Sequence, residues 1–148
     1  MLTLLVTSPR VAPGLLSWQA WTVLRDASRV LAGSAGHPLI PALTEAGVVA
    51  SVVEAPAQES ALASLLASVV TAADGPVVWL VPPDSGASLS SLLSALSAVA
   101  DVPVQVVHGS RDLPGSHLLD LVAIMDTLRV SCPWDREQTH ASLLKYLL

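Results

Sequence analysis

The sequence predicts an α/β protein: a parallel sheet of about four or five strands with helices on both faces, followed by a C-terminal helical segment. Short apolar runs rich in valine alternate with helical patterns over most of the chain. After residue 115 helical patterns follow one another with no strand between them. The hydrophobic fraction of 52% and the charged fraction of 13% suit a sheet that is covered on both faces.

Four apolar runs have the length and composition of buried parallel strands. They are "LTLLV" at 2–6, "VVASVV" at 48–53, "VVWLV" at 77–81 and "VPVQVV" at 102–107. Each is bounded by Pro, Gly or Asp. Right-handed crossovers between such strands place the connecting helices on both faces of the sheet.

Four helical patterns lie between or after these strands. The first, 17–33, opens on Ser17 as an N-cap and closes on Gly33. The others span 38–47, 58–75 and 88–100. We therefore expect the order β, α, α, β, α, β, α, β, α, which is typical of a doubly covered sheet.

The pattern changes after residue 115. Leu118, Val122, Met125 and Leu128 form one stripe of a helix. A turn follows, and Asp135 with Gln138 forms a capping pair for a second helix that we expect to continue through Leu148. A boundary near 109–114 then separates an α/β domain at 1–112 from the start of an all-α domain at 113–148.

Composition excludes several classes of function. A net charge of -5 with scattered basic residues argues against a nucleic-acid partner. No apolar run reaches the roughly 18 residues of a membrane span. The N-terminus does not resemble a secretory signal, so we expect a cytoplasmic protein. The single cysteine, Cys132, excludes an internal disulfide and favours a structural thiol.

The strand ends carry little recognisable chemistry. The loop "TSPRVAPG" lacks the glycine patterns of a phosphate cradle, and Pro9 and Pro13 supply no N–H donors. Asp84 could bind a polar ligand, although a turn or cap is the commoner role of such a residue. The four histidines lack metal-ligand spacing, and we expect loop or surface positions for them. They are His37, His108, His117 and His140.

The C-terminal stretch has the most varied side chains. Trp134 can stack on a planar base, and Gln138, Thr139 and His140 offer hydrogen-bonding groups near a helix N-terminus. Lys145 supplies a positive charge one to two turns farther on. The alternative is a capped helix whose Trp134 covers the edge of a core.

Residues 121–148, "LVAIMDTLRVSCPWDREQTHASLLKYLL", resemble the opening of the MazG family of nucleoside triphosphate pyrophosphohydrolases. In that family a helix ending M-D-x-L-R is followed by C-P-W-D-x-x-Q-T-H-x-S-L and by Y-L-L. The run covers about the last fifth of the chain. The matching residues are Met125, Asp126, Leu128, Arg129, Cys132, Pro133, Trp134, Asp135, Gln138, Thr139, His140, Ser142, Leu143, Tyr146, Leu147 and Leu148.

The resemblance implies hydrolysis of a nucleoside triphosphate to the monophosphate and diphosphate, with Mg²⁺ held by paired glutamates that come next in the family. The chain stops just before them, so we expect the N-terminal part of a longer protein, inactive by itself and with its metal ligands after Leu148. We expect no catalytic residue or metal ligand in this segment. The expected substrate-binding residues are Trp134, Gln138, Thr139 and Lys145.

The preceding part is similar to half of a tetrapyrrole methylase-like fold, which some MazG proteins carry at their N-terminus. His37, Pro38 and Leu39 match the H-P pair of that domain. The glycine-rich loop that contacts S-adenosylmethionine is replaced by "TSPRVAPG", and no room remains for a second α/β half. The resemblance therefore implies a truncated, non-methylating domain.

Three functions stay open from the sequence. The first is an accessory domain and the first helices of a nucleoside triphosphate pyrophosphohydrolase. The second is a small-molecule-binding or assembly module, because a high apolar content with few charges often marks an interface; we expect a homo-oligomer. The third is an S-adenosylmethionine-dependent methyltransferase.

Overall fold

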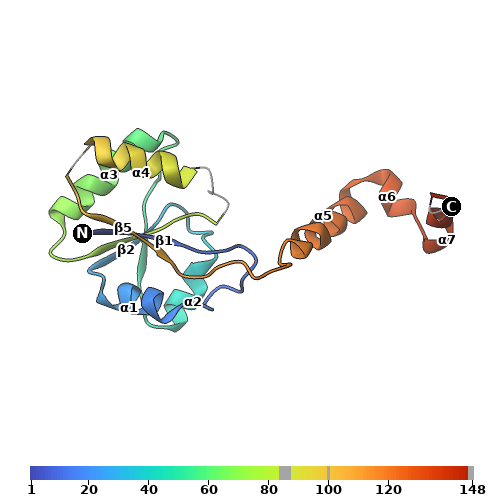
Figure 1. Cartoon of the computed structure of the whole chain (residues 1–148), viewed down its shortest axis with the longest axis horizontal. Coiled ribbons are helices and arrows are strands. Elements are labelled where there is room, and N and C mark those ends of the chain that lie inside the picture. The colour runs from blue at the N-terminus through green and yellow to red at the C-terminus, as the bar shows by residue number, and fades with distance from the viewer. Residues whose placement is uncertain (84–87, 100, 147–148) are drawn as a thin grey trace. The chain divides into compact units, whose positions relative to one another are not determined.

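The computed structural model describes residues 1–83, 88–99 and 101–146. The chain divides into two compact units, Met1–Arg111 and Asp112–Leu148 (Figure 1). Asp84, the polar residue considered above as a ligand or turn residue, lies outside the described residues. Within the described ranges, no helix is long and apolar enough to cross a membrane.

The first unit is built on a five-stranded, wholly parallel sheet with the strand order β3-β2-β4-β1-β5. β1 lies between β4 and β5, and Leu4 stands opposite Trp79 and Val106. The predicted fold class, an α/β unit followed by a helical C-terminal part, is confirmed. The strands are β1 (Leu2–Val6), β2 (Arg29–Ala32), β3 (Ala50–Val52), β4 (Val77–Leu80) and β5 (Val104–His108).

Two pairs of helices cover the two faces of this sheet (Figure 1). Leu24 of α1 and Leu43 of α2 are buried with Val78 and Leu80 in one cluster, whereas Leu66 of α3 packs in the other cluster with Trp79. Each face therefore has its own apolar core, which is the main source of stability for this unit. The helices are α1 (Trp18–Asp26), α2 (Leu39–Glu45), α3 (Glu59–Ala72) and α4 (Ser88–Val99).

The predicted helix at 17–33 is correct at its start and wrong in its second half. The Oγ of Ser17 caps α1 by accepting a hydrogen bond from the Ala20 N–H at 3.3 Å. The helix ends at Asp26, and both the N–H and the Oγ of Ser28 donate to the Pro76 carbonyl, at 2.8 and 3.0 Å. Residues 29–32 then form β2, which inserts between β3 and β4. Sheet pairing and burial on both faces outweigh the helical pattern of this stretch.

The second unit is helical but does not contain the single long helix predicted from Asp135 through Leu148. The chain leaves α6 at Gln138 and begins a new helix after Thr139. The Oγ1 of Thr139 accepts from the Ser142 N–H at 3.2 Å, and the Ser142 Oγ accepts from the Thr139 N–H at 2.9 Å. This capping box, rather than the predicted Asp135 and Gln138 pair, starts the last helix. The elements are α5 (Leu118–Ser131), α6 (Pro133–Glu137), α7 (His140–Leu143) and the 3₁₀ turn η1 (Leu144–Tyr146).

Candidate functional site

The predicted substrate-binding residues all lie in the short elements that follow α5. Trp134 is the second residue of α6, and Gln138 follows the last residue of that helix. Thr139 is the N-cap of α7, and Lys145 lies in η1. Pro133 suits the first position of α6, because that position needs no N–H donor.

An aromatic pair joins α6 to η1. The ring centroids of Trp134 and Tyr146 are 6.0 Å apart at an interplanar angle of 62°, an edge-to-face contact. The Lys145 Nζ lies 4.9 Å from the centroid of the Tyr146 ring. Because 51% of Trp134 is still exposed, its indole can accept a second planar group. The structure therefore brings Trp134 and Lys145 together around Tyr146, which the sequence prediction did not include although it begins the matched Y-L-L.

Gln138 and Thr139 hold the turn between the two short helices. The Gln138 Nε2 donates to the Trp134 carbonyl at 3.0 Å, and its Oε1 accepts from the Ser142 Oγ at 2.7 Å. The Thr139 side chain is engaged in the capping box. Both predicted binding residues thus use their polar groups to fix the backbone beside Trp134.

Arg129 connects α5 to the same turn. One of its guanidinium nitrogens, Nη1, donates to the carbonyls of Asp135 and Gln138, at 2.8 Å each. Both carbonyls lie at the end of α6, where the Asp135 carbonyl also accepts from the Gln138 N–H at 3.2 Å. The sequence prediction did not give this role to Arg129, although the residue closes the matched M-D-x-L-R.

The described residues do not provide a Mg²⁺ site. Across 1–83, 88–99 and 101–146, no group of three or more His, Cys, Asp or Glu side chains is arranged to hold a metal ion. In the second unit, two side chains of these types form an exposed pair, with His117 Nδ1 and Asp120 Oδ2 3.3 Å apart. This pair has too few ligands to hold the ion.

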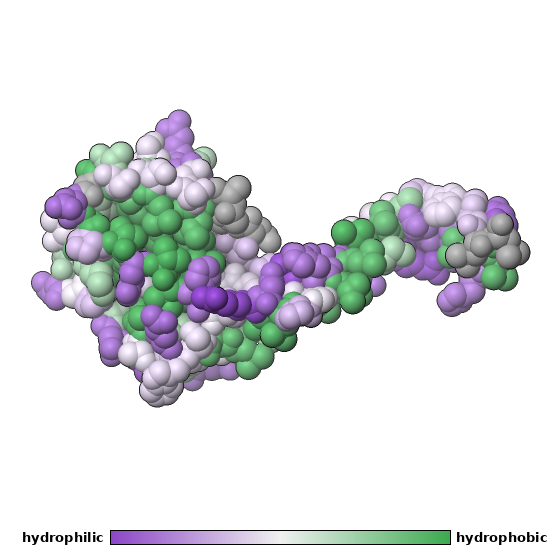
Figure 2. Space-filling model, viewed as in Figure 1, coloured by the Kyte–Doolittle hydropathy of each residue, from purple (hydrophilic) through white to green (hydrophobic). Residues whose placement is uncertain are grey.

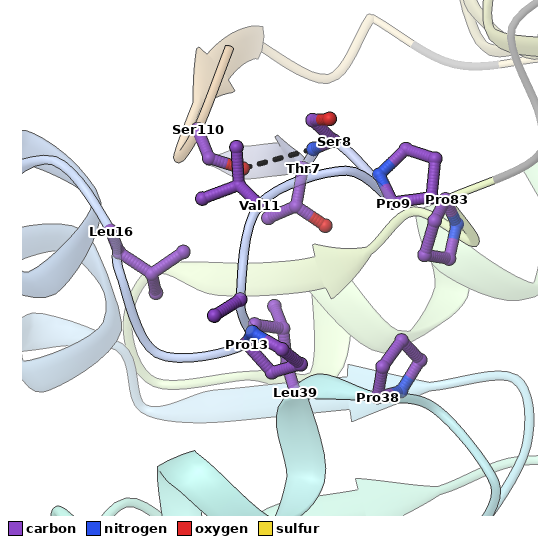
Figure 3. A pocket seen from close by; sticks show the side chains of 11 residues that line it. Thr7, Ser8, Pro9, Val11, Pro13, Leu16, Pro38, Leu39, Pro83 and Ser110 are labelled. Carbon is purple, nitrogen blue, oxygen red and sulfur yellow. Dashed lines mark hydrogen bonds between the residues drawn. The ribbon is translucent and has the colours of Figure 1, made fainter. Parts of the chain in front are cut away.

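A cavity of about 210 Å³ opens at the carboxyl ends of the strands in the first unit (Figure 3). β1 and β4 are neighbours whose following segments lead to helices on opposite faces, and such a switch point is where open α/β sheets bind ligands. The lining is mainly proline and aliphatic, with the hydroxyl residues Thr7, Ser8 and Ser110. The Ser8 N–H donates to the Ser110 Oγ at 2.9 Å and joins the ends of β1 and β5. The lining residues in the described part of the chain carry no charge, so a neutral ligand fits better than a phosphate.

His37 lies in the loop before α2, which agrees with the expected loop setting, but its side chain is buried and not at the surface. Only 6% of the residue is accessible. Its Nδ1 accepts from the Leu39 N–H at 3.3 Å, which leaves the proton on Nε2 to donate to the Val81 carbonyl at 3.3 Å. Burial lowers the pKa of His37, an effect that the hydrogen bond to Val81 partly opposes. A neutral imidazole with both nitrogens engaged ties the start of α2 to the end of β4.

Comparison with known proteins gives three partial relatives. Over 35 residues the chain is 63% identical to a nucleoside triphosphate pyrophosphohydrolase of Mycolicibacterium smegmatis, covering 24% of this chain and 11% of that protein. Over 75 residues it is 35% identical to a nucleoside triphosphate pyrophosphohydrolase of Mycobacterium tuberculosis, covering 51% of this chain and 21% of the relative. It is also 49% identical over 51 residues to an uncharacterised 26.1 kDa protein in the blaB 3′ region of Streptomyces cacaoi, covering 34% and 21% of the two chains. No family model matches the chain.

The chain is thus a partial homologue of nucleoside triphosphate pyrophosphohydrolases. The matches span about a fifth or less of the length of these curated relatives. The resemblance found in the sequence to this class of hydrolase is therefore supported, while the comparisons do not show the tetrapyrrole methylase-like domain.

Proposed function

We propose that this chain supplies an accessory α/β domain and the first helices of a nucleoside triphosphate pyrophosphohydrolase, which converts a nucleoside triphosphate and water to the monophosphate and diphosphate. The observation that carries the proposal is the 63% identity to a protein of that name, together with the motif from Met125 to Leu148. In this proposal residues 1–112 are a degenerate tetrapyrrole methylase-like domain, and residues 113–148 begin an all-α pyrophosphohydrolase domain.

Trp134 is the proposed contact for the nucleobase, because its indole is half exposed and held by Tyr146 and by the turn at Gln138. Lys145 is the proposed contact for a phosphate. Gln138 and Thr139 act on the substrate mainly by fixing the backbone around Trp134. Mg²⁺ would neutralise charge on the phosphates, and its acidic ligands are proposed to follow Leu148.

The test compares the 148-residue chain with the same chain extended by the residues encoded after Leu148. Diphosphate release from nucleoside triphosphates with Mg²⁺ is expected for the extended protein and not for the shorter one. An extension that lacks an acidic cluster, or an extended protein that releases no diphosphate, would contradict the proposal.

Trp134→Ala in the extended protein is expected to raise KM by roughly fivefold to 150-fold, since base stacking is worth about 1 to 3 kcal/mol. Trp18→Ala is the matched control, because Trp18 is 80% exposed on α1 in the other unit. An unchanged KM with a large loss of stability would show that Trp134 serves packing instead.

The cavity at the ends of β1 and β5 favours a second candidate function, the binding of a small neutral molecule by the first unit. Its place at the switch point of the sheet supports this candidate. Calorimetry with S-adenosylmethionine distinguishes this candidate function from that of a methyltransferase. Binding in the micromolar range would favour the methyltransferase. The uncharged, proline-rich lining predicts no such binding.

Assembly into a homo-oligomer is also part of the proposal. α5 has no buried residue, although it carries eight large hydrophobic side chains on its surface. In the view of Figure 2, hydrophobic surface is visible on this helical segment. A second copy of the chain is the proposed partner for α5.

A further inference from the structure

Thr7 contributes a hydroxyl group to the lining of the cavity at the carboxyl ends of the strands. The residue directly follows β1 and is only 8% exposed. In the part of the chain that the structure describes, the Thr7 Oγ1 has no hydrogen-bond partner, whereas the Ser110 Oγ accepts from the Ser8 N–H at 2.9 Å. Buried hydroxyl groups are usually hydrogen-bonded. A nearly buried hydroxyl that lacks a partner beside a cavity is therefore a place where a ligand atom can bind.

The two branches of the Thr7 side chain point in different directions. A Cβ added at Gly109 would lie 3.2 Å from the Thr7 Cγ2 and 3.1 Å from the Leu16 Cδ2, so the methyl group of Thr7 lies on the side of Gly109. The Oγ1 leaves the same Cβ in another direction. In Figure 3 it points towards the side of the cavity where Pro38 and Pro83 lie. The hydroxyl is thus directed into the cavity and the methyl group away from it.

The walls around this hydroxyl are apolar and rigid. Four of the lining residues are prolines, namely Pro9, Pro13, Pro38 and Pro83. A proline ring has a fixed backbone angle and no N–H donor, so it presents a rigid apolar face. Proline and aromatic rings pack well on each other, as they do where aromatic grooves bind proline-rich segments. The described lining residues carry no charge. The walls therefore suit a flat, neutral ring.

The volume of the cavity limits the size of the ligand. A dry apolar cavity of about 150 Å³ holds one benzene ring. The cavity beside Thr7 has a volume of about 210 Å³, which leaves room for one ring and a short substituent.

We propose that this cavity binds a neutral molecule with a single aromatic ring and a short carbonyl substituent, whose oxygen accepts a hydrogen bond from the Thr7 Oγ1. The inference rests on the second candidate function above and names its class of ligand. The prolines contact the ring, and the Thr7 hydroxyl selects the carbonyl group. Because every lining residue belongs to the first unit, binding is independent of pyrophosphohydrolase activity.

The test compares three probes of similar size. Acetophenone has both the aromatic ring and the carbonyl, α-methylstyrene has a CH₂ group in place of the carbonyl oxygen, and cyclohexyl methyl ketone has a saturated ring. Each is titrated into the ¹⁵N-labelled 148-residue chain while the backbone amide signals of Thr7, Ser8 and Val11 are followed by NMR. Acetophenone should shift these signals saturably. α-Methylstyrene should bind about three- to tenfold more weakly, the value of one hydrogen bond. Cyclohexyl methyl ketone should bind at least about threefold more weakly.

Thr7→Val removes the hydroxyl group and keeps the branched shape of the side chain. It should weaken acetophenone binding about three- to tenfold. It should leave α-methylstyrene binding within about twofold, which also shows that the variant folds. Thr22→Val is the matched control, because it makes the same change at an exposed position of α1, and it should leave the affinities for all probes within about twofold.

Two results would overturn this class of ligand and leave the second candidate function in place. They are equal affinities for the three probes, and an equal loss of acetophenone and α-methylstyrene binding in Thr7→Val. No saturable shift with any probe would contradict both the class of ligand and the second candidate function. Diphosphate release by the extended protein is measured separately, so neither failure is confused with a failure of the pyrophosphohydrolase proposal.

Discussion

At the scale of single residues, His37 is the clearest link between burial and stability. The folded chain disfavours its imidazolium form, so the pKa of His37 in the fold lies below the ordinary value of 6.5. Well above pH 6.5 the side chain is neutral in both the folded and the unfolded chain, so its full contribution to the free energy of unfolding is present. As the pH falls through 6.5 towards the lower folded pKa, the unfolded chain takes up a proton that the folded chain resists, and the free energy of unfolding decreases.

We therefore expect His37→Asn to reduce the loss of stability between pH 7.5 and pH 5.5, measured by urea unfolding. At pH 7.5 the variant should itself be less stable by about 1 to 2 kcal/mol, because the bond to the Val81 carbonyl is lost. His108→Asn changes an exposed histidine of the same unit and should retain the pH dependence of the parent. An unchanged pH dependence in His37→Asn would contradict this account.

Gly33 is required by close packing. An added Cβ would come within 3.0 Å of the Ala55 Cβ and 3.2 Å of the Trp79 ring. We expect Gly33→Ala to lower the free energy of unfolding by about 1 to 3 kcal/mol through overpacking. Gly36→Ala is the matched control, since the nearest atom is the Ser34 Oγ at 3.6 Å and its effect should stay within about 0.5 kcal/mol. Equal effects of the two changes would exclude packing as the cause.

Residue types alone predicted some of these roles and missed others. Ser17 was recognisable as an N-cap because capping is local, and the structure confirms it. The setting of His37 depends on the distant Val81 carbonyl, and the burial of Trp79 depends on the packing of several elements of the sheet and of the helices that cover it. A local pattern does not contain either fact.

At the scale of elements, the sequence predicted a strand or helix correctly where the hydrophobic pattern of only one of the two was present. The four Val-rich runs became β1, β3, β4 and β5 with shifts of a few residues at their ends. β2 was missed because "RVLA" continues a helical period and has no Gly or Pro before it. The deciding contacts, from Ser28 to Pro76, join positions 48 residues apart.

The break between α6 and α7 has a similar origin and leads to a prediction for Arg129. Its Nη1 holds the carbonyls of Asp135 and Gln138, so Arg129→Ala should loosen the end of α6. We expect amide hydrogen exchange at residues 136–139 to accelerate roughly three- to tenfold, the effect of a net hydrogen bond. Arg136→Ala removes the same charge from α6 itself and should leave the rates nearly unchanged; equal acceleration would show a general charge effect.

At the scale of the whole molecule, the two units differ in how they are stabilised. The first has a buried cluster on each face of its sheet. In the second, α5, α6 and α7 have no buried residue. Helix propensity alone gives an isolated helix of this length only marginal stability, because most helical stability in proteins comes from packing an apolar face. The apolar stripe of α5 was visible in the sequence. The periodicity of a helix shows which face is apolar, but it does not show which surface packs against that face.

Leu118, Val122 and Met125 are 66%, 55% and 53% exposed and lie along one side of α5. If a second copy covers them, the chain should sediment as a dimer or larger assembly at tens of micromolar, and Val122→Lys should shift it towards the monomer because a charge is costly to bury in an apolar interface. Thr127→Lys adds the same charge away from the stripe and should leave the assembly intact. A monomer at every concentration, or equal dissociation in both variants, would rule out α5 as the surface that joins two copies.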